Sequence, residues 1–290
     1  MQNNPNKRKL PDWLKAPLPL GENYFRLKSQ VTRHGLHTVC ESASCPNIGT
    51  CWNAGTLTLM ILGDDCTRSC RFCDVSTSRP LIPRREEPAE VAEMLHEMNI
   101  RYAVITSVDR DDLPDGGANH WAETLRKVRN KCPDMKVEAL IPDFKGDSRW
   151  IGKVCEARPD VLAHNVETVA SRQAEVRPQC RYEWSLKTLT VAREKFGLFT
   201  KSGLMLGMGE KKYEVVQTLR DLVNVGCRIV TLGQYLRPSR NHLEVVEFIH
   251  PEVFLELKEI GESLGLDHVE AGPLVRSSYR AEQQVLSVNI

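Results

Sequence analysis

The run from Cys40 to Cys73 decides the architecture of this chain, and it reads CESASCPNIGTCWNAGTLTLMILGDDCTRSCRFC. Six of the ten cysteines lie in it, as two triads: Cys40, Cys45 and Cys51 spaced C-x4-C-x5-C, then Cys66, Cys70 and Cys73 spaced C-x3-C-x2-C. Residues 56–62, TLTLMIL, alternate β-branched and long apolar side chains, which predicts a buried strand between the triads. A packed core has no need of thiols clustered in this way, so the pattern indicates metal binding.

The composition is that of a soluble globular protein, with 41% hydrophobic and 27% charged residues in 290. A net charge of +1 provides no basic stripe, so we expect no nucleic-acid partner. No apolar run approaches the roughly 20 residues that span a bilayer, so we expect no membrane association. The N-terminal MQNNPNKRKLPDW lacks the apolar core of a secretory signal. Many cysteines without an export signal indicate a reducing compartment, and we expect a cytoplasmic metalloprotein.

Alternating strands and helices begin at residue 56. The predicted strands are 56–62, 102–106, 136–141, 161–164, 202–206 and 228–232, and the predicted helices are 88–98, 119–130, 148–157, 183–196, 212–225 and 251–264. Nearly unbroken apolar strands predict a parallel sheet covered by helices, and an open doubly wound sheet and an incomplete barrel both fit. Polar residues such as Asp109 and Asn165 follow the strand C-termini. This favours a partial (β/α)6 barrel of the TIM type with extensions at both ends.

The second triad has the spacing of an iron–sulfur site with an open iron. Three thiolates on a [4Fe–4S] cluster leave one iron free for a small molecule, whereas structural zinc, the alternative, prefers four ligands in pairs. With Phe72 just before the last cysteine, and on the loop after a first barrel strand, the motif resembles the signature of radical S-adenosylmethionine (SAM) enzymes. The resemblance implies that Cys66, Cys70 and Cys73 hold a catalytic cluster. This cluster chelates SAM and cleaves it to a radical that abstracts hydrogen from unactivated carbon.

Ligand spacing alone leaves the first triad open between a catalytic cluster and a stabilising cluster or zinc site that staples the arm to the barrel. The residues themselves are more specific than their spacing, and five segments resemble the lipoyl synthase family: 37–52, 106–113, 164–168, 233–236 and 276–279. The resemblance covers about residues 11–281. It implies an enzyme that converts a protein-bound octanoyl group to lipoyl by placing sulfur on C6 and C8. Two SAM molecules are consumed per product, and an auxiliary [4Fe–4S] cluster is the sulfur donor.

The resemblance also implies that the chain is divided into three parts. Residues 1–55 form an arm with the auxiliary ligands Cys40, Cys45 and Cys51, residues 56–264 form the barrel, and residues 265–290 close on the auxiliary cluster. Its fourth ligand is carried onto Ser277, in Arg-Ser-Ser-Tyr. The alternative is that Ser277 or Ser278 caps a terminal helix over 281–286, since serine is a common N-cap.

Further residues carry expectations of lower specificity. The resemblance implies cofactor-binding positions at Phe72, Asn165, Glu167, Gly207 and Glu210, the last two in a G-x-M-x-G-x-x-E run that is also a good turn. Residues 109–112, Asp-Arg-Asp-Asp, are either a solvated charged turn or part of the site. Three arginines pair either with the cofactor carboxylate or with acidic neighbours: Arg177, Arg237 and Arg276. The four scattered cysteines are expected to be buried small apolar residues: Cys132, Cys155, Cys180 and Cys227.

The implied partners are octanoylated lipoyl carrier domains (2-oxoacid dehydrogenase E2 subunits and the glycine cleavage H protein), a ferredoxin- or flavodoxin-type reductant and an iron–sulfur cluster carrier. Two rival functions stay open. One is another radical SAM sulfur-inserting enzyme, such as a methylthiotransferase or a biotin synthase-like protein. The other is a non-enzymatic iron–sulfur carrier or zinc-stapled binding protein, which would not cleave SAM.

Overall fold

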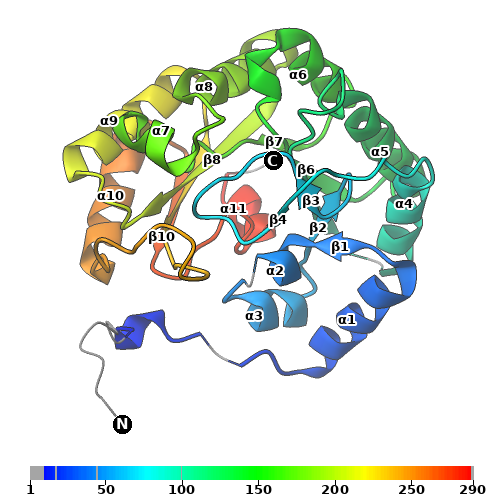
Figure 1. The fold of residues 1–290 in the computed structure, drawn as a ribbon, viewed down its shortest axis with the longest axis horizontal. Coiled ribbons are helices and arrows are strands. Elements are labelled where there is room, and N and C mark those ends of the chain that lie inside the picture. Colours follow the sequence, from blue (N-terminus) through cyan, green and yellow to red (C-terminus); the bar gives the residue numbers. More distant parts are fainter. Residues whose placement is uncertain (1–9, 17, 44, 99, 289–290) are drawn as a thin grey trace.

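An eight-stranded sheet forms the centre of the molecule, in the order β1-β2-β5-β6-β7-β8-β9-β10 (Figure 1). The computed structural model describes residues 10–16, 18–43, 45–98 and 100–288, so residues 1–9 of the predicted arm lie outside it. The sheet strands are β1 (His37–Thr38), β2 (Thr58–Ile61), β5 (Tyr102–Ser107), β6 (Lys136–Leu140), β7 (Val161–Ala163), β8 (Phe199–Leu206), β9 (Ile229–Gln234) and β10 (His268–Gly272). Within these ranges no helix combines the length and the apolar character that crossing a bilayer requires.

Neighbouring strands from β2 to β10 pair in parallel, and only the β1–β2 pair of this sheet is antiparallel. The two edge strands, β1 and β10, do not pair with each other within the described ranges, so the barrel is open on one side. The six predicted strands and the partial barrel are confirmed. The two edge strands were missed, because a two-residue strand and a strand in a polar tail carry little periodic signal.

Helices cover the outside of the curved sheet, as the ring in Figure 1 shows. They are α4 (Glu87–Met98), α5 (Ala118–Lys131), α6 (Ser148–Cys155), α8 (Tyr182–Thr190), α9 (Lys212–Asn224) and α10 (Pro251–Ser263). In α5, Trp121, Leu125 and Val128 recur at helical spacing on the buried face. A π-helical turn (Val191–Lys195) continues α8. Shorter elements are the 3-10 turns Asp12–Leu14, Phe144–Gly146 and Ala170–Arg172, the helix α7 (Gln173–Val176) and the two-stranded pair β3 (Asp65–Cys66) and β4 (Ser76–Thr77).

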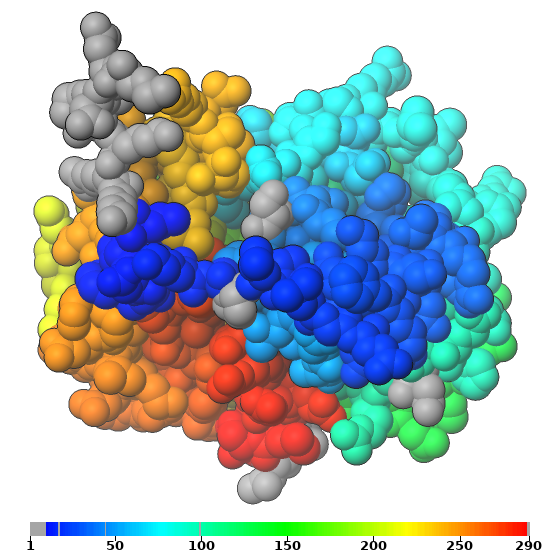
Figure 2. Space-filling model, turned by 90° about the horizontal axis from the view of Figure 1, so that it is seen from below, coloured from blue at the N-terminus to red at the C-terminus, as the bar shows by residue number. Residues whose placement is uncertain are grey.

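The arm packs into the same core as the first half of the barrel. It contains α1 (Glu22–His34), α2 (Val39–Ser42) and α3 (Ile48–Asn53). Leu27 of α1 and Trp52 of α3 are fully buried against the strand residues of that core. In Figure 2 the arm, in blue, crosses the side of the molecule on which the sheet is open. The arm therefore covers the gap that the barrel leaves.

The two ends of the barrel differ. One end is plugged by α11 (Ala281–Leu286), whose Ala281 and Val285 pack against Val104 and Ile229 inside the strands. Figure 1 shows α11 at the centre of the ring, and Figure 2 shows this C-terminal segment, in red, at the end opposite the cyan loop that follows β2. The open end, where the strands have their C-termini, is free for a site.

Candidate functional site

A cavity of about 500 Å³ opens at the C-terminal ends of the strands. Cys66, Cys70 and Cys73 line it from the loop that leaves β2, and Met60, Thr106 and Thr231 line it from the strands. The volume lies within the range of roughly 300–1,000 Å³ typical of small-molecule sites. The predicted second triad therefore surrounds a space large enough for a cofactor.

Arg68 anchors the cysteine loop. Its buried guanidinium donates two hydrogen bonds to Asp111, of 2.9 and 3.0 Å, and two to Asp143, both 2.9 Å. It lies 3.3 Å from Asp109 as well, so three carboxylates beyond β5 and β6 hold one side chain of the loop. Bidentate pairs of this kind fix orientation as well as position. Sequence reasoning missed Arg68 and Asp143, although Arg68 lies between two of the cysteines.

The charged run at residues 109–112 is not a solvated turn. Arg110 is buried and donates to the Leu62 and Leu81 carbonyl oxygens while its guanidinium pairs with Asp112. Burial raises the pKa of Asp109 to about 6, although Arg68 opposes the rise. The run instead connects the rim of β5 to the cysteine loop, which favours the second of the two alternatives, that it is part of the site.

The three thiols of the second triad have raised pKa values in the metal-free protein. Burial raises the pKa of Cys66, and it raises that of Cys73 to about 11. A hydrogen bond with Cys180, together with burial, raises the pKa of Cys70 further. Iron binds thiolates, so loading this site with an iron–sulfur cluster would release protons. Cys180 also accepts a 3.2 Å hydrogen bond from Arg68, so it is buried as predicted but has polar partners that the sequence did not indicate.

Three of the five predicted cofactor-binding residues line this cavity: Phe72, Asn165 and Glu167. Asn165 donates to Glu167 over 3.1 Å, and burial raises the pKa of Glu167. Within the described part of the chain, Asn165 Oδ1 and Arg177 Nε are buried without a hydrogen-bond partner, and both residues line the cavity. Unsatisfied buried polar atoms need a partner, so this wall fits a polar ligand such as SAM.

Gly207 and Glu210 do not line the cavity. The Glu210 carboxylate accepts from the backbone N–H groups of Gly207, at 2.5 Å, and Met208, at 3.0 Å. Gly207 has a φ of +100°, and a Cβ there would clash with the Glu247 carbonyl oxygen. Both residues build the turn after β8, and their contact with a cofactor stays a prediction. Gly203 and Met205 of the same strand line the cavity instead.

A second cavity, of about 130 Å³, adjoins the first triad. It is lined by Cys40, Cys45 and Cys51 together with Ser277, so the structure brings the four predicted auxiliary ligands to one space. Burial raises the pKa of Cys40 to about 11 and that of Cys51 to about 12. Four residues line both cavities, which therefore adjoin: Val39, Ala43, Arg276 and Ser277.

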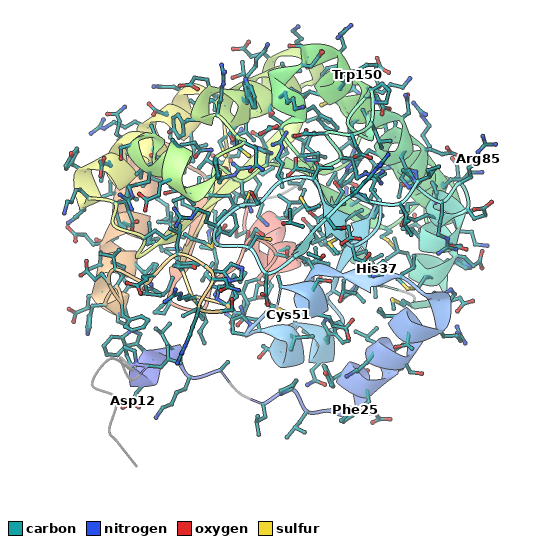
Figure 3. All side chains as sticks on the ribbon, in the orientation of Figure 1. Asp12, Phe25, His37, Cys51, Arg85 and Trp150 are labelled. Atoms are coloured by element: carbon teal, nitrogen blue, oxygen red, sulfur yellow. The ribbon has the colours of Figure 1, made fainter. Side chains whose placement is uncertain are left out.

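The second cavity lies at the open side of the barrel. β1 leads into α2 and α3, which carry the thiols, and β10 leads into the Arg-Ser-Ser-Tyr turn. Figure 3 labels Cys51 on α3, on the side of the arm that faces the ring, whereas Arg85 points away from it. Helix α11 begins after Arg280 and has no side-chain N-cap, so Ser277 and Ser278 do not cap it.

The three predicted arginines differ in their partners. Arg237 pairs with Glu244 at 3.3 Å. Arg177 and Arg276 form no ion pair with any residue that the structure places, and both line the large cavity. Burial lowers the pKa of Arg276, although Cys45 and Glu167 nearby oppose this. Arg177 and Arg276 are thus available to a carboxylate ligand.

In the described ranges, no three His, Cys, Asp or Glu side chains are grouped so as to hold a single metal ion. A [4Fe–4S] cluster binds each thiolate at a different iron, so its ligands surround a volume rather than a point. Two cavities that each border a cysteine triad fit that requirement.

Comparison with known proteins identifies the family. The "Radical SAM superfamily" pattern matches residues 60–222, and the "N-terminal domain of lipoyl synthase of Radical_SAM family" matches residues 1–45. Lipoyl synthase of Chlorobaculum parvum is 51% identical over 97% of this chain and 96% of its own length. That of Flavobacterium johnsoniae is 51% identical over 95% and 96%, and the mitochondrial lipoyl synthase of Nematostella vectensis is 50% identical over 97% of both chains.

Solved structures agree on the fold. Methylornithine synthase superposes with a TM-score of 0.52 at 14% identity, over 84% of this chain and 71% of its own. The [FeFe]-hydrogenase maturase HydG superposes with a TM-score of 0.56 at 14% identity, over 80% and 61%. Since near full-length relatives share half of the sequence, the chain belongs to the lipoyl synthase family of radical SAM enzymes, which use a [4Fe–4S] cluster and SAM to insert sulfur.

Proposed function

We propose that this chain inserts sulfur at C6 and C8 of an octanoyl group carried by a protein, with the two cysteine triads holding two separate [4Fe–4S] clusters. The observation that carries the proposal is the adjoining pair of cavities, one at each triad, with Ser277 lining both. Cys66, Cys70 and Cys73 would hold the catalytic cluster. Cys40, Cys45, Cys51 and Ser277 would hold the auxiliary one.

When bound, one cluster with SAM supplies a carbon-centred radical able to break unactivated C–H bonds, and the other cluster supplies sulfur. Two such bonds are opened, so two SAM molecules are used per product. Arg177, Asn165 and Glu167 offer charge and hydrogen bonds to the polar parts of SAM on the wall of the large cavity. Phe72 and Met205 provide apolar contact there.

The acyl chain fits the junction between the cavities. Val39 and Ala43 line both spaces with apolar side chains, and Ile48 and Leu57 extend the apolar wall into the smaller one. Apolar walls bind a hydrocarbon chain and exclude water from a radical. A chain threaded through this junction would have its terminal carbons close to both triads. Ser277, a harder ligand than a thiolate, would leave its iron the most easily released.

The chain's partners follow from this chemistry. The substrate is an octanoyl-lysine on a lipoyl carrier domain, such as an E2 subunit or an H protein. A ferredoxin- or flavodoxin-type protein supplies low-potential electrons, and a cluster carrier restores the auxiliary site. Ten free cysteines favour a reducing compartment, which we propose to be the cytoplasm.

The test is a reaction without oxygen on an octanoyl-lysyl peptide, with reconstituted protein, SAM and reductant, followed by mass spectrometry. We expect the peptide to gain two sulfur atoms and lose two hydrogens in its cyclic disulfide form. SAM cleavage with an unchanged peptide would contradict the proposed substrate. No SAM cleavage by protein with a full iron content would contradict the radical function itself.

A further inference from the structure

The proposed auxiliary site is divided between two parts of the chain that are far apart in sequence. Its three cysteines lie on the part of the arm that follows β1, and Ser277 lies beyond β10. These strands are the two unpaired edges of the open sheet, so no sheet hydrogen bonds between them align the two halves. Some other contact must fix Ser277 relative to the thiols.

Asn47 makes that contact, through its side chain on one side and its backbone on the other. Its side-chain Nδ2 donates a 2.6 Å hydrogen bond to the Leu274 carbonyl oxygen, three residues before Ser277. Its backbone carbonyl oxygen accepts a 2.9 Å hydrogen bond from the N–H of Cys51, another predicted ligand of the same triad. Asn47 is only 4% exposed, so water does not compete for the amide. One residue thus links a predicted ligand of the arm to the C-terminal segment.

The segment that Asn47 holds is fixed on its other sides. Gly233 of β9 has no side chain, and a Cβ there would clash with the Val275 carbonyl oxygen, so the turn lies directly on the strand. Val275 N–H donates to the Gly272 carbonyl oxygen at 3.1 Å, and Tyr279 N–H donates to that of Arg276 at 2.9 Å. A turn held this tightly transmits the position of Leu274 to Ser277.

We propose that Asn47 is a positioning residue whose side-chain amide holds the segment 274–277 across the open side of the barrel, so that Ser277 faces the Cys40, Cys45 and Cys51 thiols. The inference rests on the proposed function only in assigning Ser277 as a ligand. The hydrogen bond and its effect on the segment belong to the metal-free protein as well. They can therefore be measured without any cluster.

The first experiment measures backbone amide exchange in the metal-free, reduced protein for a peptide spanning residues 273–280. Asn47→Asp keeps the shape of the side chain and loses the N–H donor, and Asn47→Ala removes both. We expect exchange in this peptide to be roughly three- to tenfold faster in either variant, as the loss of one buried hydrogen bond predicts. Should Asn47→Ala fail to fold, Asn47→Asp still decides the result.

Asn53→Ala is the matched control. Asn53 lies on the same arm and its amide donates to the Leu20 carbonyl oxygen, which belongs to the arm rather than to the C-terminal segment. We expect this variant to leave exchange in 273–280 unchanged. Unchanged exchange in both Asn47 variants, or an equal increase in Asn53→Ala, would overturn the proposal.

The second experiment measures the properties of the cluster bound at the first triad. In a Cys66→Ala, Cys70→Ala, Cys73→Ala background only the first triad can load, and iron content and the electron paramagnetic resonance spectrum of the reduced cluster are recorded. We expect Asn47→Asp to change the spectrum in the same way as Ser277→Ala, and the double variant to add nothing further. Independent, additive changes would contradict action through Ser277. If Ser277→Ala alone leaves the spectrum unchanged, the ligand assignment fails while amide exchange still decides the position of the segment.

Discussion

The two cysteine triads are built in opposite ways. Cys66, Cys70 and Cys73 come from one short loop, which Arg68 fastens to three aspartates at the ends of adjacent strands. The first triad is short too, but the serine that completes its cavity lies 226 residues beyond Cys51, on the other edge of the sheet. One site is therefore preorganised by local contacts, and the other depends on how the two ends of the chain meet.

The difference indicates which site can change its geometry during a reaction without disturbing the rest of the fold. A loop fixed by a buried, bidentate arginine returns to one geometry after each electron transfer, as a reusable cofactor site requires. A site closed by a hydrogen bond and a turn can open without disturbing the barrel strands. We expect the consumed cluster in the second kind of site, and four predictions break or sharpen that contrast.

The largest effect separates the two triads outright. Cys70→Ala should lower SAM cleavage by roughly three orders of magnitude, to background, because the open-iron cluster cannot assemble. Cys45→Ala should keep SAM cleavage and lose sulfur insertion, since only the donor site is damaged. 5′-Deoxyadenosine and modified peptide are quantified in the same reaction. Loss of cleavage in both variants would mean that the sites are not separable.

Arg68→Met tests the anchoring of the second triad. Removing this guanidinium leaves the buried Asp143 and the partly buried Asp109 and Asp111 without their cation, and should destabilise the protein by about 3–5 kcal/mol. Arg84→Met removes the pair between the exposed Arg84 and the partly buried Glu90 and should change stability by less than about 1 kcal/mol. Urea unfolding measures both. Equal stability of the two variants would show that the aspartates do not depend on Arg68.

Ser277→Cys tests the first triad at its distant ligand. A thiolate binds iron more tightly than an alkoxide, so a cluster should still form but release its iron less readily. We expect the ratio of doubly to singly sulfurated peptide to fall roughly tenfold by mass spectrometry. Ser278→Cys, in the adjacent position, is the control and should leave the ratio unchanged. An undiminished ratio in Ser277→Cys would remove the rationale for a serine ligand.

A further effect is a pH dependence of stability that arises on the Arg68 side of the site. Burial lowers the pKa of His164 from 6.5 to about 4, with Asp143 opposing and Arg177 and Arg68 contributing. Between pH 6.5 and about 4, His164 binds a proton in the unfolded chain but stays neutral in the folded chain. Stability therefore falls as pH drops from 6.5 toward 4, by about 3 kcal/mol at most. His164→Gln should flatten this dependence in urea unfolding curves at pH 6.5 and 5. An identical slope would exclude His164 as its source.

The sequence predicts much of the fold because the six central strands are apolar and regularly spaced. It also predicts that the six cysteines and Ser277 form two separate sites, because the spacing of the cysteines and the similarity of short segments to a known family identify these residues. It does not reveal Arg68, Asp143 or Cys180, whose importance arises only when loops from different strands meet. Nor does it indicate Asn47, whose partner Leu274 is 227 residues away. Pairings across such separations leave no local pattern to read.

The open side of the barrel has a consequence for the lifetime of the protein. A group bound only by the folded chain adds its binding free energy to folding, so a cluster that joins the two edges of the sheet also stabilises the sheet. Consuming the proposed auxiliary cluster would remove this contribution at each turnover. The edge strand β10 would then lack that support, and an unpaired edge strand is able to pair with other chains. We expect the protein without this cluster to be the form most exposed to aggregation and proteolysis, and prompt reloading would protect it.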